Sequence, residues 1–194
     1  FAVYDDDAVR EASTQEIVRR YYSALCNKRK GNGSDVEIHK IELLMQQLGC
    51  KAQEKRRCVG AALARAEETG APAVAIELND GRIVTGKTSG LLGASSAALL
   101  NALKTLAGID KETDIIAHEV LEPIQKLKVE NLGNHNPRLH TDEVLIALAV
   151  TAANSEIAAR ALSHLSDLRY TEVHSTVILS QVDLDTLKKL GIDH

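Results

Sequence analysis

Residues 81–88 read Gly-Arg-Ile-Val-Thr-Gly-Lys-Thr and match the phosphate-loop spacing G-x-x-x-x-G-K-[ST] at every position. A phosphate loop turns its backbone N–H groups inward around an anion, which favours small residues between the two fixed glycines. Here Ile83, Val84 and Thr85 stand between them, and their branched side chains are typical of a strand. The octet is therefore either a nucleotide-binding loop or one arm of a β-hairpin, and its composition favours the hairpin.

The residues before the octet strengthen the hairpin interpretation. Residues 73–78 alternate in polarity as a half-buried strand does. Asn79-Asp80-Gly81 follows, and Asp-Gly between apolar runs is a strong hairpin signal because a tight turn needs residues that tolerate positive φ. A phosphate loop would also need a magnesium-binding aspartate after an apolar run, and Asp183 after residues 177–179 is a poor candidate.

Composition and charge exclude several classes of protein. The chain has 194 residues, of which 44% are hydrophobic, enough to bury a core. No apolar run approaches the roughly 20 residues that span a bilayer, so we expect a soluble protein without a membrane partner. The 23 basic and 27 acidic residues leave no basic patch for nucleic acid, and four Tyr and one Phe offer little for base stacking.

The three cysteines indicate a reducing compartment. Cys26, Cys50 and Cys58 are an odd number and lack C-x-x-C spacing, which argues against a disulfide framework and against a cysteine zinc site. We therefore expect a cytoplasmic protein.

The first fifty residues read as helices. Asp5, Asp6 and Asp7 favour the start of a helix that runs to about Lys28, and the capping box at residues 34–37 opens a second helix with Leu44 and Leu48 among its inward residues. The chain begins at Phe1 without a methionine, which indicates a fragment of a longer protein. We predict a helical segment over 1–50 that connects to a missing N-terminal part, and an α/β domain over 51–194.

The α/β domain is predicted from strands that alternate with helices. Beyond the hairpin, strands are predicted over 114–117 and 171–179. Predicted helices cover about 54–68, 91–107, 119–131, 155–168 and 182–190, and another opens at His140 or Thr141. This order is typical of a three-layer α/β domain with a mixed sheet that starts in a hairpin.

Five blocks of sequence carry a resemblance to a known family. They are residues 73–78, 85–89, 122–125, 136–145 and 172–180. Together they resemble the bacterial family catalogued as domain of unknown function 1846, from about Arg19 to Ile192. Its members are larger, which implies that this chain is their C-terminal portion. Some members are labelled ATP-dependent peptidase, but no residue here supports a peptidase, and the family brings no established catalytic residues.

A second, architectural resemblance concerns the hairpin at 80–86 and the helix after it. This order is similar to the cytidine-deaminase-like fold, in which the helix after the hairpin bears the first zinc ligand. A zinc deaminase needs a His or Cys two residues before a catalytic Glu, and a P-C-x-x-C on the next helix. Here the first helix offers Ser95, Ser96 and Ala97, and P-C-x-x-C is absent. The resemblance implies a deaminase-like topology without zinc.

Lys87, Thr88 and Ser89 form the first candidate ligand site. They lie where the hairpin meets the start of a helix, and the free N–H groups and dipole of a helix start favour an anion. The alternative is that Thr88 or Ser89 only caps the helix and Lys87 is solvated.

Arg138, His140, Asp142 and Glu143 form a second candidate group at another helix start, and His174 lies on the last predicted strand. Two histidines and a carboxylate can hold a metal or transfer protons. No spacing such as H-x-x-x-H supports a metal, so a satisfied buried histidine beside an acidic first turn is favoured, and we predict no metal and no cofactor.

Three functions remain open from the sequence. The preferred one is an α/β domain that binds a small anionic molecule through residues 87–89 and 138–143, with the reaction unassigned. The second is a nucleotide hydrolase that uses Lys87 and Thr88. The third is a structural or homo-oligomerisation module in which the first two helices pack on the rest of the parent protein or on a second copy.

Overall fold

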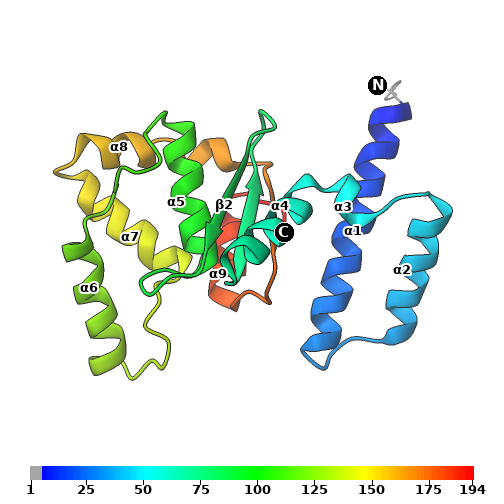
Figure 1. Cartoon of the computed structure of the whole chain (residues 1–194), viewed down its shortest axis with the longest axis horizontal. Coiled ribbons are helices and arrows are strands. Elements are labelled where there is room, and N and C mark those ends of the chain that lie inside the picture. Colours follow the sequence, from blue (N-terminus) through cyan, green and yellow to red (C-terminus); the bar gives the residue numbers. More distant parts are fainter. Residues whose placement is uncertain (1–5) are drawn as a thin grey trace. The chain divides into compact units, whose positions relative to one another are not determined.

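The computed structural model describes residues 6–194, apart from the side chains of residues 52 and 53 (Figure 1). The predicted capping by Asp5 lies outside these residues. The chain divides between Gly60 and Ala61 into two compact units. Along residues 6–194, no helix combines the length and the apolar composition that a membrane span requires.

The first unit contains α1 (Asp6–Arg29), α2 (Asp35–Gln47) and α3 (Ala52–Lys55). The predicted cap of α2 is confirmed, because the Ser34 hydroxyl oxygen accepts a hydrogen bond from the Val36 N–H at 3.1 Å. Val18, Met45 and Cys50 form a small buried cluster between the helices. A small interface of this kind needs few apolar side chains from each helix.

The prediction that Leu44 and Leu48 face inward is wrong. They are 43% and 47% exposed, and Ile38 and Met45 are the buried residues of α2. The physical reason is that, among the described elements, the main neighbour of α2 is α1, so α2 buries one narrow stripe. The predicted helix over 54–68 is also interrupted, because buried Arg56 separates α3 from α4 (Arg57–Thr69).

The octet forms part of a hairpin between β1 (Ala73–Glu77) and β2 (Ile83–Lys87). The strands are antiparallel, with Ala73 opposite Lys87 and Glu77 opposite Ile83. Gly81 closes the turn with φ at +83°, and its N–H donates to the Leu78 carbonyl at 2.9 Å. The hairpin is confirmed, and the phosphate loop is wrong because its middle residues are extended and paired.

Gly86 lets the helix α5 (Ala94–Leu106) lie close on β2. A Cβ atom at this position would come within 2.1 Å of the Ala98 backbone nitrogen and 2.7 Å of the Ala94 carbonyl oxygen. The Asn101 side-chain amide also donates to the Thr85 carbonyl at 3.0 Å. The structure thus explains both fixed glycines of the octet: Gly81 is needed for the turn, and Gly86 is needed for the close packing of α5.

The sheet contains β3 (Glu172–Ser175) as its third strand and has the order β2-β1-β3. Both pairs are antiparallel, so the prediction of a mixed sheet is wrong. Parallel pairing in the described chain is limited to two isolated bridges, Leu92 with Leu139 and Glu172 with Asp193. The hairpin fixes the direction of β2, and β3 returns along the opposite edge of β1, whose residues 73–76 are fully buried.

Two predicted strands differ from the structure. Residues 114–117 form no strand, although Ile115 and Ile116 are only 5% exposed. An apolar run can be buried in a loop as well as in a sheet. The predicted strand 171–179 ends at Ser175, because its hydroxyl accepts from the Val177 N–H at 3.2 Å and closes a local turn.

Figure 1 also shows the remaining elements of the chain. They are α6 (His118–Lys126), the π-helical turn η1 (Leu127–Asn131), α7 (Thr141–Ala152), α8 (Glu156–Leu162), the 3-10 turn η2 (Leu165–Leu168) and α9 (Gln181–Lys189). α5 contacts β1 and β2 as well as α7 and α8, so it runs through the centre of the second unit. The main core forms around it, with Leu99 and Leu103 fully buried.

Candidate functional site

A pocket of about 280 Å³ lies where the first turns of α5, α7 and α9 meet. The N-caps of these helices, Gly93, His140 and Ser180, all line it. Its wall also includes Thr88, Ser95, Arg138 and Asp183. Because N–H groups at a helix start carry partial positive charge, such a meeting point favours an anion unless a protein group already occupies it. We call this cavity the α5 pocket.

Of these three helix starts, that of α5 is the one without a side-chain cap. Its N-cap is Gly93, which has no side chain to accept from the first turn. Within the described chain, no acceptor is present for the N–H groups of Ala94, Ser95 and Ser96. The predicted capping by Thr88 or Ser89 is wrong, because the Ser89 hydroxyl accepts instead from the Leu92 N–H at 3.1 Å, before the helix begins.

Ser95 adds a hydroxyl to this open helix start. It is 3% exposed and lines the α5 pocket, and among residues 6–194 its hydroxyl makes no hydrogen bond. The neighbouring Ser96 is fully buried, but its hydroxyl donates to the Leu139 carbonyl at 2.9 Å. The residue is nearly buried, but its unpaired hydroxyl is not fully shielded, so a ligand or water in the pocket can complete its hydrogen bonds.

The start of α7, in contrast, is occupied by Asp183. Its Oδ1 accepts from the Thr141 N–H and the Thr141 hydroxyl, both at 2.9 Å. Its Oδ2 accepts from the Ser180 hydroxyl at 2.8 Å and lies 3.3 Å from His140 Nδ1. The carboxylate therefore joins α9 to α7 and neutralises the helix start that would otherwise compete for an anion.

These contacts determine the charge of Asp183. Burial alone would raise its pKa, but the hydrogen bonds donated by the Thr141 N–H, the Ser180 hydroxyl, the Thr141 hydroxyl and His140 outweigh burial. The net effect holds the pKa of Asp183 below its ordinary value of 3.8. The side chain is therefore ionised at neutral pH and can only accept hydrogen bonds.

Ser180, His140 and Asp183 do not form a hydrolase triad. In a triad the serine and the carboxylate use different nitrogens of the histidine ring. Here both lie 3.3 Å from His140 Nδ1, and the serine donates to the carboxylate. Nδ1 is thus engaged by two oxygens, and within the described chain no hydrogen-bond partner is present for Nε2. The free ring nitrogen is what His140 can offer to a ligand.

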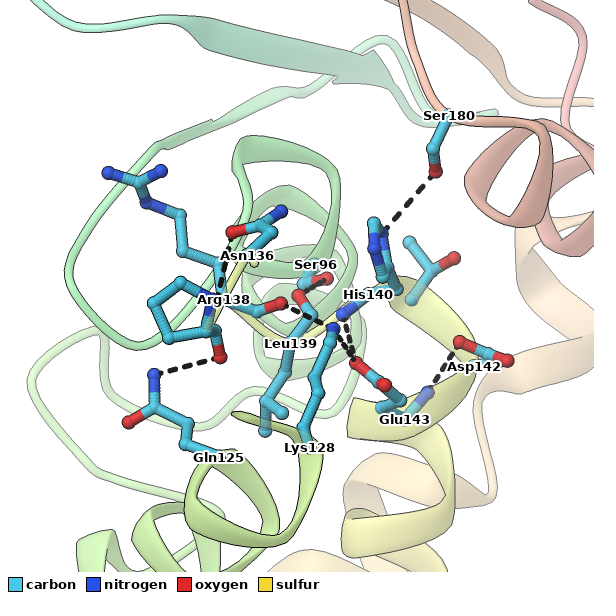
Figure 2. Close-up of polar contacts among 12 residues, drawn as sticks. Ser96, Gln125, Lys128, Asn136, Arg138, Leu139, His140, Asp142, Glu143 and Ser180 are labelled. Atoms are coloured by element: carbon cyan, nitrogen blue, oxygen red, sulfur yellow. Dashed lines mark hydrogen bonds and ion pairs between the residues drawn. The ribbon is translucent and has the colours of Figure 1, made fainter. Parts of the chain in front are cut away.

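Lys128 and Glu143 fix the backbone of residues 138–140 by hydrogen bonds. The Lys128 ammonium donates to the Arg138 carbonyl and to Glu143 Oε2, each at 2.8 Å. The same Glu143 oxygen accepts from the His140 N–H at 2.7 Å, which completes the first turn of α7 (Figure 2). Lys128 comes from the π-helical turn η1 and is 4% exposed. This pair fixes the position of the pocket wall.

Arg138 lies at the rim of the pocket. Its Nε donates to the Ser89 carbonyl at 2.8 Å, which ties the loop before α5 to the segment before α7. Figure 2 shows its side chain extending away from His140 and Ser180, which face each other. Along the described residues no partner is present for its terminal nitrogens. They can attract an anion to the rim, while the groups inside the pocket are His140 and the start of α5.

The pocket brings together three of the eight predicted site residues, Thr88, Arg138 and His140. Lys87 is exposed at the end of β2, and Ser89 lies outside the pocket. Asp142 is exposed, Glu143 is engaged by Lys128 and His174 is buried on β3. Across residues 6–194, no group of three or more His, Cys, Asp or Glu side chains is placed to hold a metal ion.

Comparison with known proteins identifies the family. The model described as "Domain of unknown function DUF1846, C-terminal" matches residues 54–194, and its N-terminal counterpart matches residues 1–49. The chain belongs to the DUF1846 family. The UPF0371 protein of Streptococcus thermophilus is 54% identical over 193 residues, and that of Corynebacterium glutamicum is 55% identical over 191 residues. These alignments cover 100% and 98% of this chain but only 39% and 38% of the two relatives.

The DUF1846 chain therefore spans well under half the length of these bacterial relatives, and their names state no ligand or reaction. The predicted resemblance to this family is confirmed. Sequence reasoning missed Ser95, Ser180 and Asp183 as site residues. The one available signal was the spacing from Ser180 to Asp183, which fits a capping box and predicts a helix start, not a contact with His140.

Proposed function

We propose that the second unit of this DUF1846 chain binds a small anionic molecule in the α5 pocket. The observation that carries the proposal is Ser95, a nearly buried residue whose hydroxyl has no partner in the described chain and is not fully shielded, beside helix N–H groups without acceptors. An anion held there would accept from two or three backbone N–H groups and from the hydroxyl. His140 lines the same pocket, and its Nε2 would supply a further contact, while Arg138 favours anions at the rim.

The test uses inorganic phosphate as the probe and backbone amide NMR as the readout. Phosphate should shift the amide signals of residues 93–96 and 140. Ser95→Ala should weaken phosphate binding by about tenfold or more, which corresponds to one lost hydrogen bond to a charged group. It should leave stability unchanged within about 0.5 kcal/mol, since no protein hydrogen bond is lost.

Ser96→Ala is the matched control. It removes the hydrogen bond to the Leu139 carbonyl, so it should lower the free energy of unfolding by about 1–2 kcal/mol. It removes no hydroxyl from the pocket, so phosphate affinity should stay within about twofold. Equal phosphate affinity in the wild type and in Ser95→Ala, or no phosphate-dependent shift at residues 93–96, would refute the proposal.

A second candidate function is that of a structural module in the first unit. Several apolar residues of α2 are exposed there, among them Val36, Leu43 and Leu44. Scattered exposed apolar residues are normal, but a row of them on one helix supports a partner surface, either the rest of the parent protein or a second copy. Sedimentation velocity should show self-association that Leu43→Glu reduces, and a concentration-independent monomer would contradict the second-copy form.

The finer parts of the predicted fold and setting are also proposals. A three-layer, deaminase-like scaffold is supported by the hairpin followed by α5 and by the burial of both faces of β1. The antiparallel β3 is a departure from a mixed sheet. A cytoplasmic setting is supported by the three free cysteines. The division of the chain at residue 50 is proposed on sequence pattern alone.

A further inference from the structure

A second pocket lies along another face of α5 and shares no residue with the α5 pocket. It measures about 210 Å³. Residues 97, 100, 101 and 104 of α5 line it, and their spacing places them on one side of the helix. The opposite wall comes from residues 113–116, which overlap the predicted strand 114–117, and from Leu121 of α6. We define it as the Lys104 pocket.

Most of this pocket is aliphatic. Leu100, Ile115, Ile116 and Leu121 are each at most 7% exposed, and each contributes to the wall. Ligand pockets of drug-sized molecules are commonly about 300–1,000 Å³. A cavity of about 210 Å³ with these walls therefore suits a smaller molecule with a short hydrocarbon part.

Lys104 places a cation among these aliphatic walls. It is 8% exposed, and its ammonium donates to the Lys111 carbonyl. An ammonium has three donors, and within the described chain this is its sole hydrogen bond, with no carboxylate paired to it. A buried ammonium that is not paired with a carboxylate is costly, so Lys104 favours an incoming anion.

Lys128 shows how this chain satisfies a buried lysine when the role is structural. It is 4% exposed, and it donates both to a backbone carbonyl and to the Glu143 carboxylate. Lys104 has the carbonyl but lacks the carboxylate, and it lines a cavity. A ligand carboxylate would complete the same arrangement.

We propose that the Lys104 pocket binds a small monocarboxylate with a short aliphatic chain. The carboxylate pairs with the Lys104 ammonium, and the hydrocarbon packs on Leu100, Ile115 and Leu121. The exposed carboxylate of Asp114 also lines the pocket. It repels a second negative charge, so the site selects a monoanion over a dicarboxylate or a phosphate. This site is independent of the α5 pocket.

The test titrates the 194-residue chain with isovalerate and follows backbone amide NMR signals. Isovalerate should shift the signals of residues 97–104 and 113–118, whereas those of 93–96 and 140 stay in place. The uncharged isostere 3-methylbutan-1-ol should bind at least about tenfold more weakly, because it cannot form the charge-assisted hydrogen bond. Equal binding of the alcohol and the acid, or no shift at residues 97–104, would overturn the proposal.

Four variants distinguish the effect of the Lys104 charge on binding from an effect on folding. Lys104→Met should weaken isovalerate by about tenfold or more, while Lys111→Met, which keeps the backbone carbonyl that Lys104 contacts, should leave affinity within about twofold. Asp114→Asn should strengthen isovalerate binding, since it removes a like charge from the wall. If Lys104→Met fails to fold, Ala97→Leu fills the cavity with the charge retained. Unchanged affinity in Ala97→Leu would then also overturn the proposal.

Discussion

Gly86→Ala is expected to be among the most damaging single-methyl additions in the second unit. The new Cβ would lie 2.1 Å from the Ala98 nitrogen and 2.7 Å from the Ala94 oxygen. Normal contact needs about 3.5 Å, so α5 would have to move away from β2 by roughly 1.4 Å. Both contacted atoms belong to the helix backbone, so no side-chain rotation can relieve the overlap.

The cost follows from what α5 buries. A gap of about 0.5–1 Å already removes a quarter to a half of the dispersion energy of the atoms that face it. Overpacking in a core costs about 1–3 kcal/mol, and the loss of packing along Leu99 and Leu103 adds to it. We therefore expect a loss of about 4 kcal/mol or more in the free energy of unfolding, against a total of about 5–15 kcal/mol for a typical domain.

Hydrogen exchange of backbone amides in β1 and α5 is the appropriate assay, since it reports the second unit separately from the first. Gly90→Ala is the matched control, because a Cβ at Gly90 has no neighbour within 4 Å and should change stability by less than about 0.5 kcal/mol. Protection of residues 73–77 in Gly86→Ala within about 1 kcal/mol of the wild type would refute the packing argument. A phosphate loop would instead need Gly86 for a nucleotide and would tolerate the change when empty.

Three further outcomes are expected from the network around the α5 pocket. The pKa of folded Asp183 lies below its ordinary value of 3.8. Its contribution to stability is therefore present above pH 3.8 and is lost as the pH falls through the folded pKa. Chemical denaturation at a series of pH values should show this loss of stability. Asp183→Asn should flatten that acid dependence and lower stability at pH 7 by about 1.5–3 kcal/mol. Lys128→Met should cost about 2–3 kcal/mol in the same assay, because it leaves Glu143 without its partner. Lys126→Met, whose side chain is 69% exposed, should cost less than about 0.5 kcal/mol.

The hairpin was predictable because its signals are local. The alternation over 73–78, the Asp80-Gly81 turn and the branched residues of β2 each specify the conformation of their own neighbours. The phosphate-loop spacing competed with them, but it fixes only four of eight positions. Composition at the other positions decided correctly between the two.

The errors occurred where distant partners decide the structure. An apolar run such as 114–117 reads the same whether it pairs with a strand or covers α5, and the sequence does not say which edge is free. The early end of β3 depends on the Ser175 hydroxyl, which binds the backbone two residues ahead. Leu44 and Leu48 fit a helical stripe, but the width of the buried stripe depends on how many neighbours α2 has.

The same limit applies to the candidate sites. His140 was predictable as a polar group at a helix start. Its contact with Asp183 spans 43 residues of sequence, and the spacing of Asp183 from Ser180 indicates only a helix cap. Ser95 was noted only as the residue that replaces a zinc ligand in the deaminase comparison. Its importance comes from the absence of a hydrogen-bond partner in the described chain, which only coordinates can show.

The hydrogen bonds of the second unit separate groups that hold the fold from groups that remain open to a ligand. Ser96, Lys128 and Asp183 use their polar atoms on protein partners. Ser95 and Lys104 are nearly as buried, but each lines a cavity and has donors without a partner in the described chain. Substitution of the first group should therefore lower stability first and ligand affinity only as a consequence. Substitution of the second group should lower affinity with little change in stability, so the two measurements together assign each residue to its role.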